Sequence, residues 1–199
     1  MSYADVKLIY ALVCVGLGLV IFSPTLMGAV VFPQGERFSE LWMLGPNHLA
    51  EDYPFNVREN ELYLVYLGVG NHMGSSVYYV LNVKFRNQNE PLPNSTTGTA
   101  SSLQSLYEYR LFVADNRSAE VPLTLMFPEI SFSRYRASVG SIVINGVSFP
   151  VNESVSWDSQ KSGFYFQLFI ELWKYDPASD GFSYHNRFVS RWLNVTGSL

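Results

Sequence analysis

The stretch Phe164–Tyr175, FYFQLFIELWKY, decides the fold class of this chain. Apolar residues recur at every second position from Phe164 to Leu172, so their side chains share one face of an extended strand. A helix would repeat them every three or four residues instead. The stretch therefore predicts a long β-strand with one buried face.

The same period of two runs through Val77–Phe85, whose odd-numbered positions are all apolar. The opposite face of this second strand carries Tyr78, Asn82 and Lys84. In antiparallel sheets one face commonly packs on the core while the other meets water. We therefore expect Tyr78, Asn82 and Lys84 to be exposed to solvent.

Other short alternating runs surround these two strands. A strand is expected after residue 38, ending at the turn Gly45-Pro46-Asn47. Asn145-Gly146 lies between two apolar runs, the strongest short-range signal for a hairpin, because a type I′ turn needs positive φ at both positions. Further strands are predicted at residues 61–69, 107–113, 121–127 and 188–195. About eight to ten strands predict an all-β chain, an antiparallel, immunoglobulin-like β-sandwich.

The amino-terminal part differs from the rest, because no charged residue occurs from Leu8 through Gly35. A helix needs roughly 20 apolar residues to cross a bilayer. We therefore predict a single transmembrane anchor over residues 1–33 and a β-domain over residues 34–199. A cleaved signal peptide is the alternative, but Ser23-Pro24-Thr25 and Met27-Gly28-Ala29 are poor cleavage sites.

Four Asn-x-Ser/Thr sequons, at Asn94, Asn116, Asn152 and Asn194, lie beyond the anchor. In a secreted domain such sequons mark glycan acceptors on surface loops. They predict a cytoplasmic amino terminus and a glycosylated domain outside the cell membrane. The first sequon lies in the polar stretch 87–102, which reads as a long surface loop.

Composition excludes several classes of function. The 13 basic and 17 acidic residues predict no nucleic-acid partner. The single cysteine, Cys14, allows neither an intrachain disulfide nor a thiolate zinc site. His48, His72 and His185 lie in separate turn-like segments without metal-ligand spacing, and are expected to face water.

Catalytic motifs are also missing from the sequence. There is no G-x-S-x-G elbow and no phosphate-binding glycine loop. Glu51 and Asp52 are adjacent carboxylates that would point to opposite faces of a strand, so they read as solvated. We expect no catalytic, cofactor-binding or metal-binding residue, and a chain that is not an enzyme.

Two motif-bearing stretches resemble a known family. Residues 35–57, GERFSELWMLGPNHLAEDYPFNV, and residues 68–85, GVGNHMGSSVYYVLNVKF, resemble the archaeal domain-of-unknown-function sixteen-sixteen proteins. The later segments 162–175 and 188–197 are similar to that family's closing strands, whereas residues 87–118 read as an insertion. The resemblance implies an archaeal, membrane-attached β-domain without an assigned activity. Members often carry several membrane passes, whereas one is predicted here.

The segment 38–54 is expected to be a structural junction between the anchor and the first sheet. Its apolar residues do not alternate strictly, which predicts a bulge or an early turn near Trp42. Trp42 itself is expected to pack in the core.

The aromatic residues are the remaining candidates for function. Tyr78, Tyr165 and Trp173 fall on the face opposite the apolar one in their strands, and could contact a partner or a glycan. The favoured hypothesis is a non-catalytic, membrane-anchored subunit that binds other membrane or envelope proteins. The alternatives are an accessory or glycan-binding factor of surface glycosylation, and a pilin-like filament subunit.

Overall fold

The computed structural model describes residues 3–29 and 36–197, and the chain divides into two compact units between Glu36 and Arg37. The first unit is the helix α1 (Tyr3–Ala29). The large apolar side chains described on α1 are all exposed. Within the described residues, no helix combines the length and the apolarity that crossing a membrane requires.

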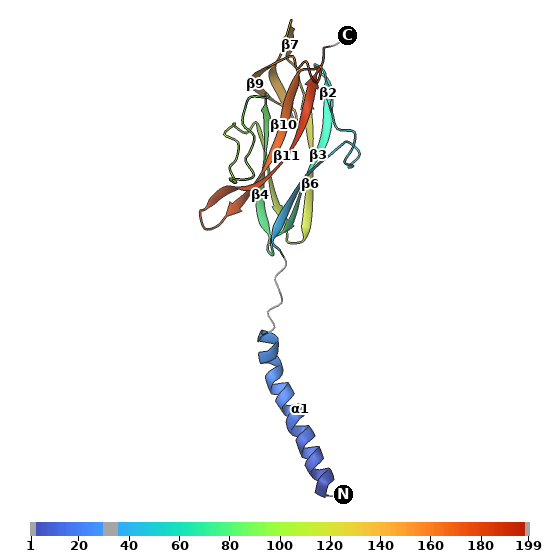
Figure 1. The fold of residues 1–199 in the computed structure, drawn as a ribbon, viewed down its shortest axis with the longest axis vertical. Coiled ribbons are helices and arrows are strands. Elements are labelled where there is room, and N and C mark those ends of the chain that lie inside the picture. The colour runs from blue at the N-terminus through green and yellow to red at the C-terminus, as the bar shows by residue number, and fades with distance from the viewer. Residues whose placement is uncertain (1–2, 30–35, 198–199) are drawn as a thin grey trace. The chain divides into compact units, whose positions relative to one another are not determined.

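The second unit consists of two β-sheets packed face to face (Figure 1). Its eleven strands, among the described residues, are β1 (Phe38–Leu44), β2 (Asn56–Val57), β3 (Leu62–His72), β4 (Val77–Arg86), β5 (Tyr107–Val113), β6 (Arg117–Met126), β7 (Ile130–Ser133), β8 (Arg136–Ile144), β9 (Val147–Ser156), β10 (Tyr165–Asp176) and β11 (Gly181–Val195). The mostly antiparallel β-sandwich predicted from the sequence is confirmed.

The strand order places distant parts of the chain side by side. One sheet runs β1-β3-β6-β8-β7, with β9 paired to the other edge of β8, and the second runs β2-β11-β10-β4-β5. All pairs are antiparallel except β2 with β11. Immunoglobulin domains have seven or nine strands, so the eleven strands show a sandwich without showing that subtype.

The core lies between the two inner faces. Phe166, Leu168, Ile170 and Leu172 of β10 are at most 2% exposed, as their alternation predicts. They pack against inward residues of the facing sheet, of which Leu67, Leu123 and Ile142 are fully buried. Burying each such side chain contributes about 1.5–3 kcal/mol.

The turn between β8 and β9 also forms as predicted. Asn145 has φ 50° and Gly146 has φ 80°. Two consecutive positive φ values are what a type I′ hairpin turn needs.

The outer face of β4 is not exposed to solvent as expected, because Lys84 is buried and Tyr78 and Asn82 are half-buried. Lys84 and Arg86 are 3% and 7% exposed, and across the strand pair Gln167 and Glu171 are 3% and 0% exposed. The segment 87–106, which we name the covering segment, contributes Ser101 to this face. These polar residues are buried because they bind one another and the covering segment, a long-range arrangement that strand alternation does not reveal.

Trp42 does not pack in the core, and no bulge forms near it. β1 pairs with β3 in an unbroken register in which Trp42 lies opposite Gly68. The indole covers Gly68 on the outer face, where an added Cβ would lie 2.0 Å from Trp42 Cε2. Its Nε1 also faces Glu120 Oε2 at 3.4 Å. The missing side chain of Gly68 makes room for the ring, so Trp42 finds its packing outside the sandwich.

Candidate binding site on the outer face of the five-stranded sheet

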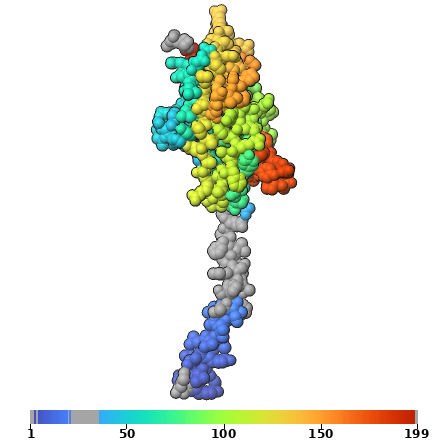
Figure 2. Space-filling view, turned by 180° about the vertical axis from the view of Figure 1, so that it is seen from behind, coloured from blue at the N-terminus to red at the C-terminus, as the bar shows by residue number. Residues whose placement is uncertain are grey.

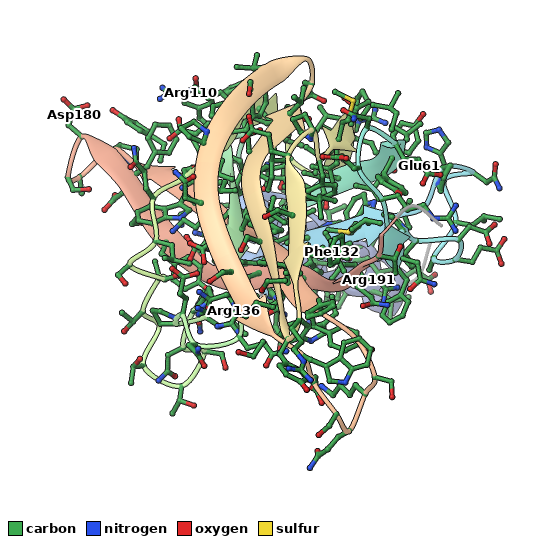
Figure 3. All side chains as sticks on the ribbon, turned by 90° about the horizontal axis from the view of Figure 1, so that it is seen from above. Glu61, Arg110, Phe132, Arg136, Asp180 and Arg191 are labelled. Carbon is green, nitrogen blue, oxygen red and sulfur yellow. The ribbon has the colours of Figure 1, made fainter. Side chains whose placement is uncertain are left out.

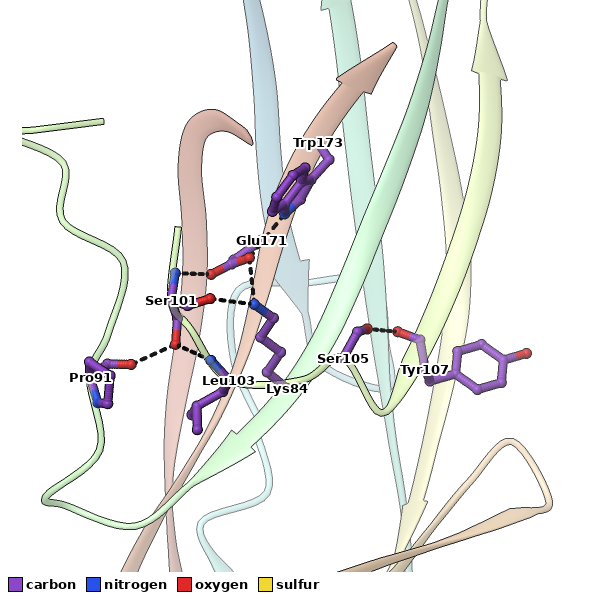
Figure 4. Close-up of polar contacts among 8 residues, drawn as sticks. All are labelled: Lys84, Pro91, Ser101, Leu103, Ser105, Tyr107, Glu171 and Trp173. Atoms are coloured by element: carbon purple, nitrogen blue, oxygen red, sulfur yellow. Dashed lines mark hydrogen bonds and ion pairs between the residues drawn. The ribbon is translucent and has the colours of Figure 1, made fainter. Parts of the chain in front are cut away.

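A buried ion pair lies under the covering segment (Figure 4). Lys84 Nζ lies 2.9 Å from Glu171 Oε2, and the two side chains are 4% and 0% exposed. Lys84 also donates to the carbonyl of Ser101 at 2.9 Å, while the Ser101 N–H donates to Glu171 Oε1 at 2.7 Å. Burying a charge is costly unless it is paired and hydrogen-bonded. Both conditions are met here, so the pair fastens the covering segment to the sheet.

The same carboxylate orients Trp173. The indole Nε1 donates to Glu171 Oε2 at 2.9 Å, as Figure 4 shows. Both oxygens of Glu171 therefore have partners, which fits a structural role rather than a proton-transfer role. The result is a half-buried tryptophan fixed on the outer face of β10.

A pocket of about 220 Å³ opens beside Trp173. Its lining comes from β4, β5, β10 and β11 and consists of Val80, Asn82, Glu108, Arg110, Trp173 and Phe182. Asn82 Oδ1 is buried and has no hydrogen-bond partner. Leaving a buried acceptor unpaired costs about 1–3 kcal/mol. A ligand that donates a hydrogen bond at this position would recover that cost.

A second unpartnered atom belongs to the same face. The hydroxyl of Tyr184 is buried without a partner, and its ring lies 6.1 Å from that of Trp173. Burial, followed by the charge of Glu171, raises the pKa of Tyr184 to about 12, so the phenol keeps its proton. Among the described side chains that are not exposed, these are the two buried oxygen or nitrogen atoms that lack a hydrogen-bond partner: Asn82 Oδ1 and the Tyr184 hydroxyl. Both are on the outer face of one sheet.

Aromatic rings and one ion pair surround the pocket. Tyr78 packs edge-on against Phe182 at 5.2 Å, and the Arg110 guanidinium lies 5.8 Å from the centre of the Phe182 ring. Arg110 also donates to Glu108 at 3.2 Å, a contact that raises the pKa of Arg110. Phe112, opposite Tyr78 on the edge strand β5, is 73% exposed. We name Tyr78, Phe112 and Phe182 the aromatic rim.

A groove of about 440 Å³ lies elsewhere on the domain, alongside β11. Its lining residues are Asp52, Tyr53, Pro54, Phe55, Ser190, Arg191 and Trp192. Figure 3 shows Arg191 of this groove and Arg110 of the pocket at separate places on the sandwich. Figure 2 shows the chain around residue 50 and the β10–β11 turn around residue 180 projecting from opposite sides of the body. The groove and the pocket are thus distinct hollows of the domain.

A serine and a histidine also meet between the sheets. His185 Nε2 lies 3.0 Å from Ser39 Oγ, and Ser39 Oγ lies 2.6 Å from the hydroxyl of Tyr79. Tyr79 donates to Asn71 Oδ1 at 3.2 Å. Ser39, Tyr79 and Asn71 are fully buried. A nucleophile must reach its substrate, so this network reads as a polar tie between the two sheets.

The structure separates the three predicted aromatic candidates. Tyr78 and Trp173 lie at the pocket, as described above. Tyr165 is 7% exposed and donates to the carbonyl of Lys161 at 2.7 Å. Tyr165 is on the outer face of β10, but its burial makes it unsuitable as a contact for a partner or a glycan, which corrects that expectation.

Sequence reasoning missed Asn82, Glu108 and Arg110 as pocket residues. The signal for Asn82 was a single amide within the apolar strand Val77–Phe85. Nothing local to β5 marks Glu108 and Arg110, because only the pairing of β5 with β4 places them opposite Asn82 and Val80.

The four sequon asparagines do not share one environment. Asn94, Asn116 and Asn152 are exposed, whereas Asn194 is half-buried in β11. Asn194 Nδ2 donates to Asn56 Oδ1 at 2.9 Å, and its Oδ1 accepts from the N–H of Phe164 at 3.0 Å. Asn194 is therefore held by the fold at both ends of its amide.

The histidines occupy different surroundings as well. His48 stacks on Tyr66 and contacts Glu120. His185 is half-buried in β11 rather than in a turn, which corrects the expectation that it faces water. Within the described part of the chain, no group of three or more His, Cys, Asp or Glu residues is placed to hold a metal ion.

The fold and the pocket together define a β-sandwich domain with a polar and aromatic pocket on one outer face. The chain belongs to the family described as Domain of unknown function (DUF1616), whose model matches residues 33–133. The match spans residues 87–118, a region expected from the sequence to be an insertion, and ends before β10 and β11. A comparison with curated proteins finds no match.

Two solved structures show a distant likeness to this chain. A β-glucosidase from Listeria innocua in complex with isofagomine is 11% identical with a TM-score of 0.42, over 81% of this chain and 16% of that chain. One chain of the human complex of zinc 2-glycoprotein with prolactin inducible protein is 10% identical with a TM-score of 0.38, over 83% of this chain and 100% of that chain. This chain thus corresponds to a small part of the glucosidase.

Proposed function

We propose that the chain is a non-catalytic, membrane-anchored subunit whose β-sandwich lies outside the cell and binds another envelope protein. The contact surface is the outer face of the five-stranded sheet. The observation that carries the proposal is the pocket in which Asn82 Oδ1 is buried without a partner. It lies among aromatic rings, which are enriched in protein interfaces.

The size of the pocket favours a protein partner. Clefts for drug-sized ligands measure about 300–1,000 Å³, and this one measures about 220 Å³. That space suits one inserted side chain, and buried anchor side chains dominate the energetics of many interfaces. Phe112, an exposed aromatic on an edge strand, would add apolar contact beside it.

Support for the anchor comes from the sequence. The uncharged stretch Leu8–Gly35 is longer than the roughly 20 residues that a spanning helix needs. Its last part, residues 30–35, lies outside the described residues. The four sequons, all beyond this stretch, support the outward orientation.

The test is purification of the full chain from its native membranes in a mild detergent, with quantification of the chains that accompany it. We expect Phe112→Ala to reduce the amount of the specific partner that co-purifies at least about tenfold, as loss of an interface anchor does. Tyr135→Ala is the matched control, because Tyr135 is 64% exposed in a different hairpin. Equal retention in the two variants, or equal loss, contradicts the proposal.

A second variant separates binding from folding. Asn82→Leu removes the unpartnered acceptor and fills the pocket with an apolar side chain. The variant should unfold at a temperature no lower than the wild type, yet lose the partner. If Asn82→Leu keeps the partner, the pocket is not the contact.

A further inference from the structure

We propose that the groove between Tyr53–Phe55 and Ser190–Trp192 binds a sugar residue that carries a carboxylate, such as a uronic acid. This site is separate from the proposed protein-binding face. Its volume of about 440 Å³ lies within the range of clefts that bind small molecules, about 300–1,000 Å³.

The groove exists because the chain leaves β1, loops outward and returns beside β11. Gly45 permits this path, since an added Cβ would lie 1.9 Å from the carbonyl oxygen of Glu51. β2 then pairs in parallel with the end of β11, which fixes Phe55 beside that strand. The walls of the groove are therefore set by backbone pairing.

The cation in the groove is available to a ligand. The Arg191 guanidinium lies 3.6 Å from the centre of the Tyr53 ring. No described carboxylate lies within 4.0 Å of it. Stacking uses the flat face of a guanidinium, whereas its N–H donors lie in its plane. Arg191 can therefore stay on Tyr53 and bind a carboxylate with two parallel hydrogen bonds.

Two aromatic residues, Phe55 and Trp192, also line the groove, and two cations outside its lining lie near Trp192. Lys161 Nζ lies 5.6 Å from the centre of the Trp192 ring, and Arg86 lies 5.8 Å from it. Phe55 is half exposed. Aromatic rings offer an apolar surface to the C–H face of a sugar, and Arg191 favours a negative charge. Asp52 at the lining disfavours a second carboxylate within the groove itself, so one carboxylate near Arg191 fits best.

A partner strand is a poorer fit, because the edge of β11 just beyond the groove is already occupied by β2, which limits the length of any added strand. The N–H of Asn194 donates to the carbonyl of Phe55 at 2.7 Å, and that of Thr196 donates to the carbonyl of Val57 at 2.8 Å. Strand addition needs free backbone groups. A compact ligand therefore suits the groove better than an extended acidic peptide.

The test is isothermal titration calorimetry of the full chain in detergent micelles. The chain is titrated with trigalacturonate and, separately, with the neutral galactose trimer. We expect saturable binding of trigalacturonate that is at least about tenfold tighter than that of the neutral trimer, since hydrogen bonds to charged groups are the strong ones. Raising the salt concentration should weaken it.

Arg191→Gln should lower the affinity for trigalacturonate at least about tenfold, while Arg187→Gln, an exposed arginine on the same strand, should leave it unchanged. Equal affinity for the two trimers, no binding of trigalacturonate, or no effect of Arg191→Gln overturns the proposal. A glutamate-rich peptide that binds through Arg191 where trigalacturonate does not would also overturn it, and would assign the groove to an acidic peptide.

Discussion

At the scale of single residues, the Lys84–Glu171 pair is the strongest test of the buried polar layer. Lys84→Met leaves Glu171 buried without its counter-charge. Removing one partner of a buried pair typically costs about 3–5 kcal/mol. We therefore expect a loss of that size in the free energy of unfolding, measured by urea denaturation of the full chain in micelles.

The double variant Lys84→Met/Glu171→Leu is the control for this prediction. Replacing a whole buried pair with apolar residues is often neutral or stabilising. The double variant should therefore recover most of the loss. A single variant as stable as the wild type would show that the pair is more hydrated than its burial indicates.

His185 predicts a pH dependence of stability. Burial first, and then the charges of Lys174 and Arg187, lowers the pKa of His185 in the fold. An unfolded histidine protonates near pH 6.5. Below that pH the unfolded chain binds a proton that the fold resists, so stability falls as the pH drops. His185→Gln should show a shallower fall in melting temperature between pH 7.5 and 5.5, and parallel curves would contradict this.

Sequence alone predicted the inner faces well, because the core demands apolar residues at every second position. It failed where a polar residue is buried by a distant segment. Lys84 looks like a solvent-facing residue within its own strand, and only Ser101 and Glu171 explain its burial. The prediction that Trp42 packs in the core was wrong for a similar reason, since Gly68, its packing partner, lies on another strand.

At the scale of elements, the β8–β9 hairpin depends on its turn. Gly146→Ala places a side chain at φ 80°, a conformation that costs about 1 kcal/mol or more outside glycine. We expect the free energy of unfolding to fall by about that amount. Gly181→Ala is the matched control, because Gly181 has no positive φ and an added Cβ would lie 3.7 Å from its nearest neighbour. Equal effects of the two substitutions would refute the argument.

The covering segment shows what element-scale reasoning could and could not supply. The polar, turn-rich composition of residues 87–102 predicts a long surface loop, and no named strand falls within them. Their role in burying one face of the sheet depends on Ser101 reaching β4 and β10. Such a contact joins residues 70 positions apart, so no local pattern predicts it.

At the scale of the whole molecule, the sequons predict which asparagines carry glycans. Asn94, Asn116 and Asn152 are exposed and open to a modifying enzyme, whereas Asn194 is half-buried in β11 with its amide bonded to Asn56 and Phe164. Glycopeptide mass spectrometry of native material should find sugars on at least two of the first three, and none on Asn194. Occupancy at Asn194 alone would contradict the account.

The central claim, an outward-facing domain on a membrane anchor, is tested most directly by labelling engineered cysteines on intact cells. In a Cys14→Ser background, Tyr135→Cys places a thiol on the β-domain and Ser2→Cys places one at the amino terminus. A membrane-impermeant maleimide should label Tyr135→Cys on intact cells and Ser2→Cys only after permeabilisation. Labelling of Ser2→Cys alone, or protection of both until the cells are opened, would contradict the claim.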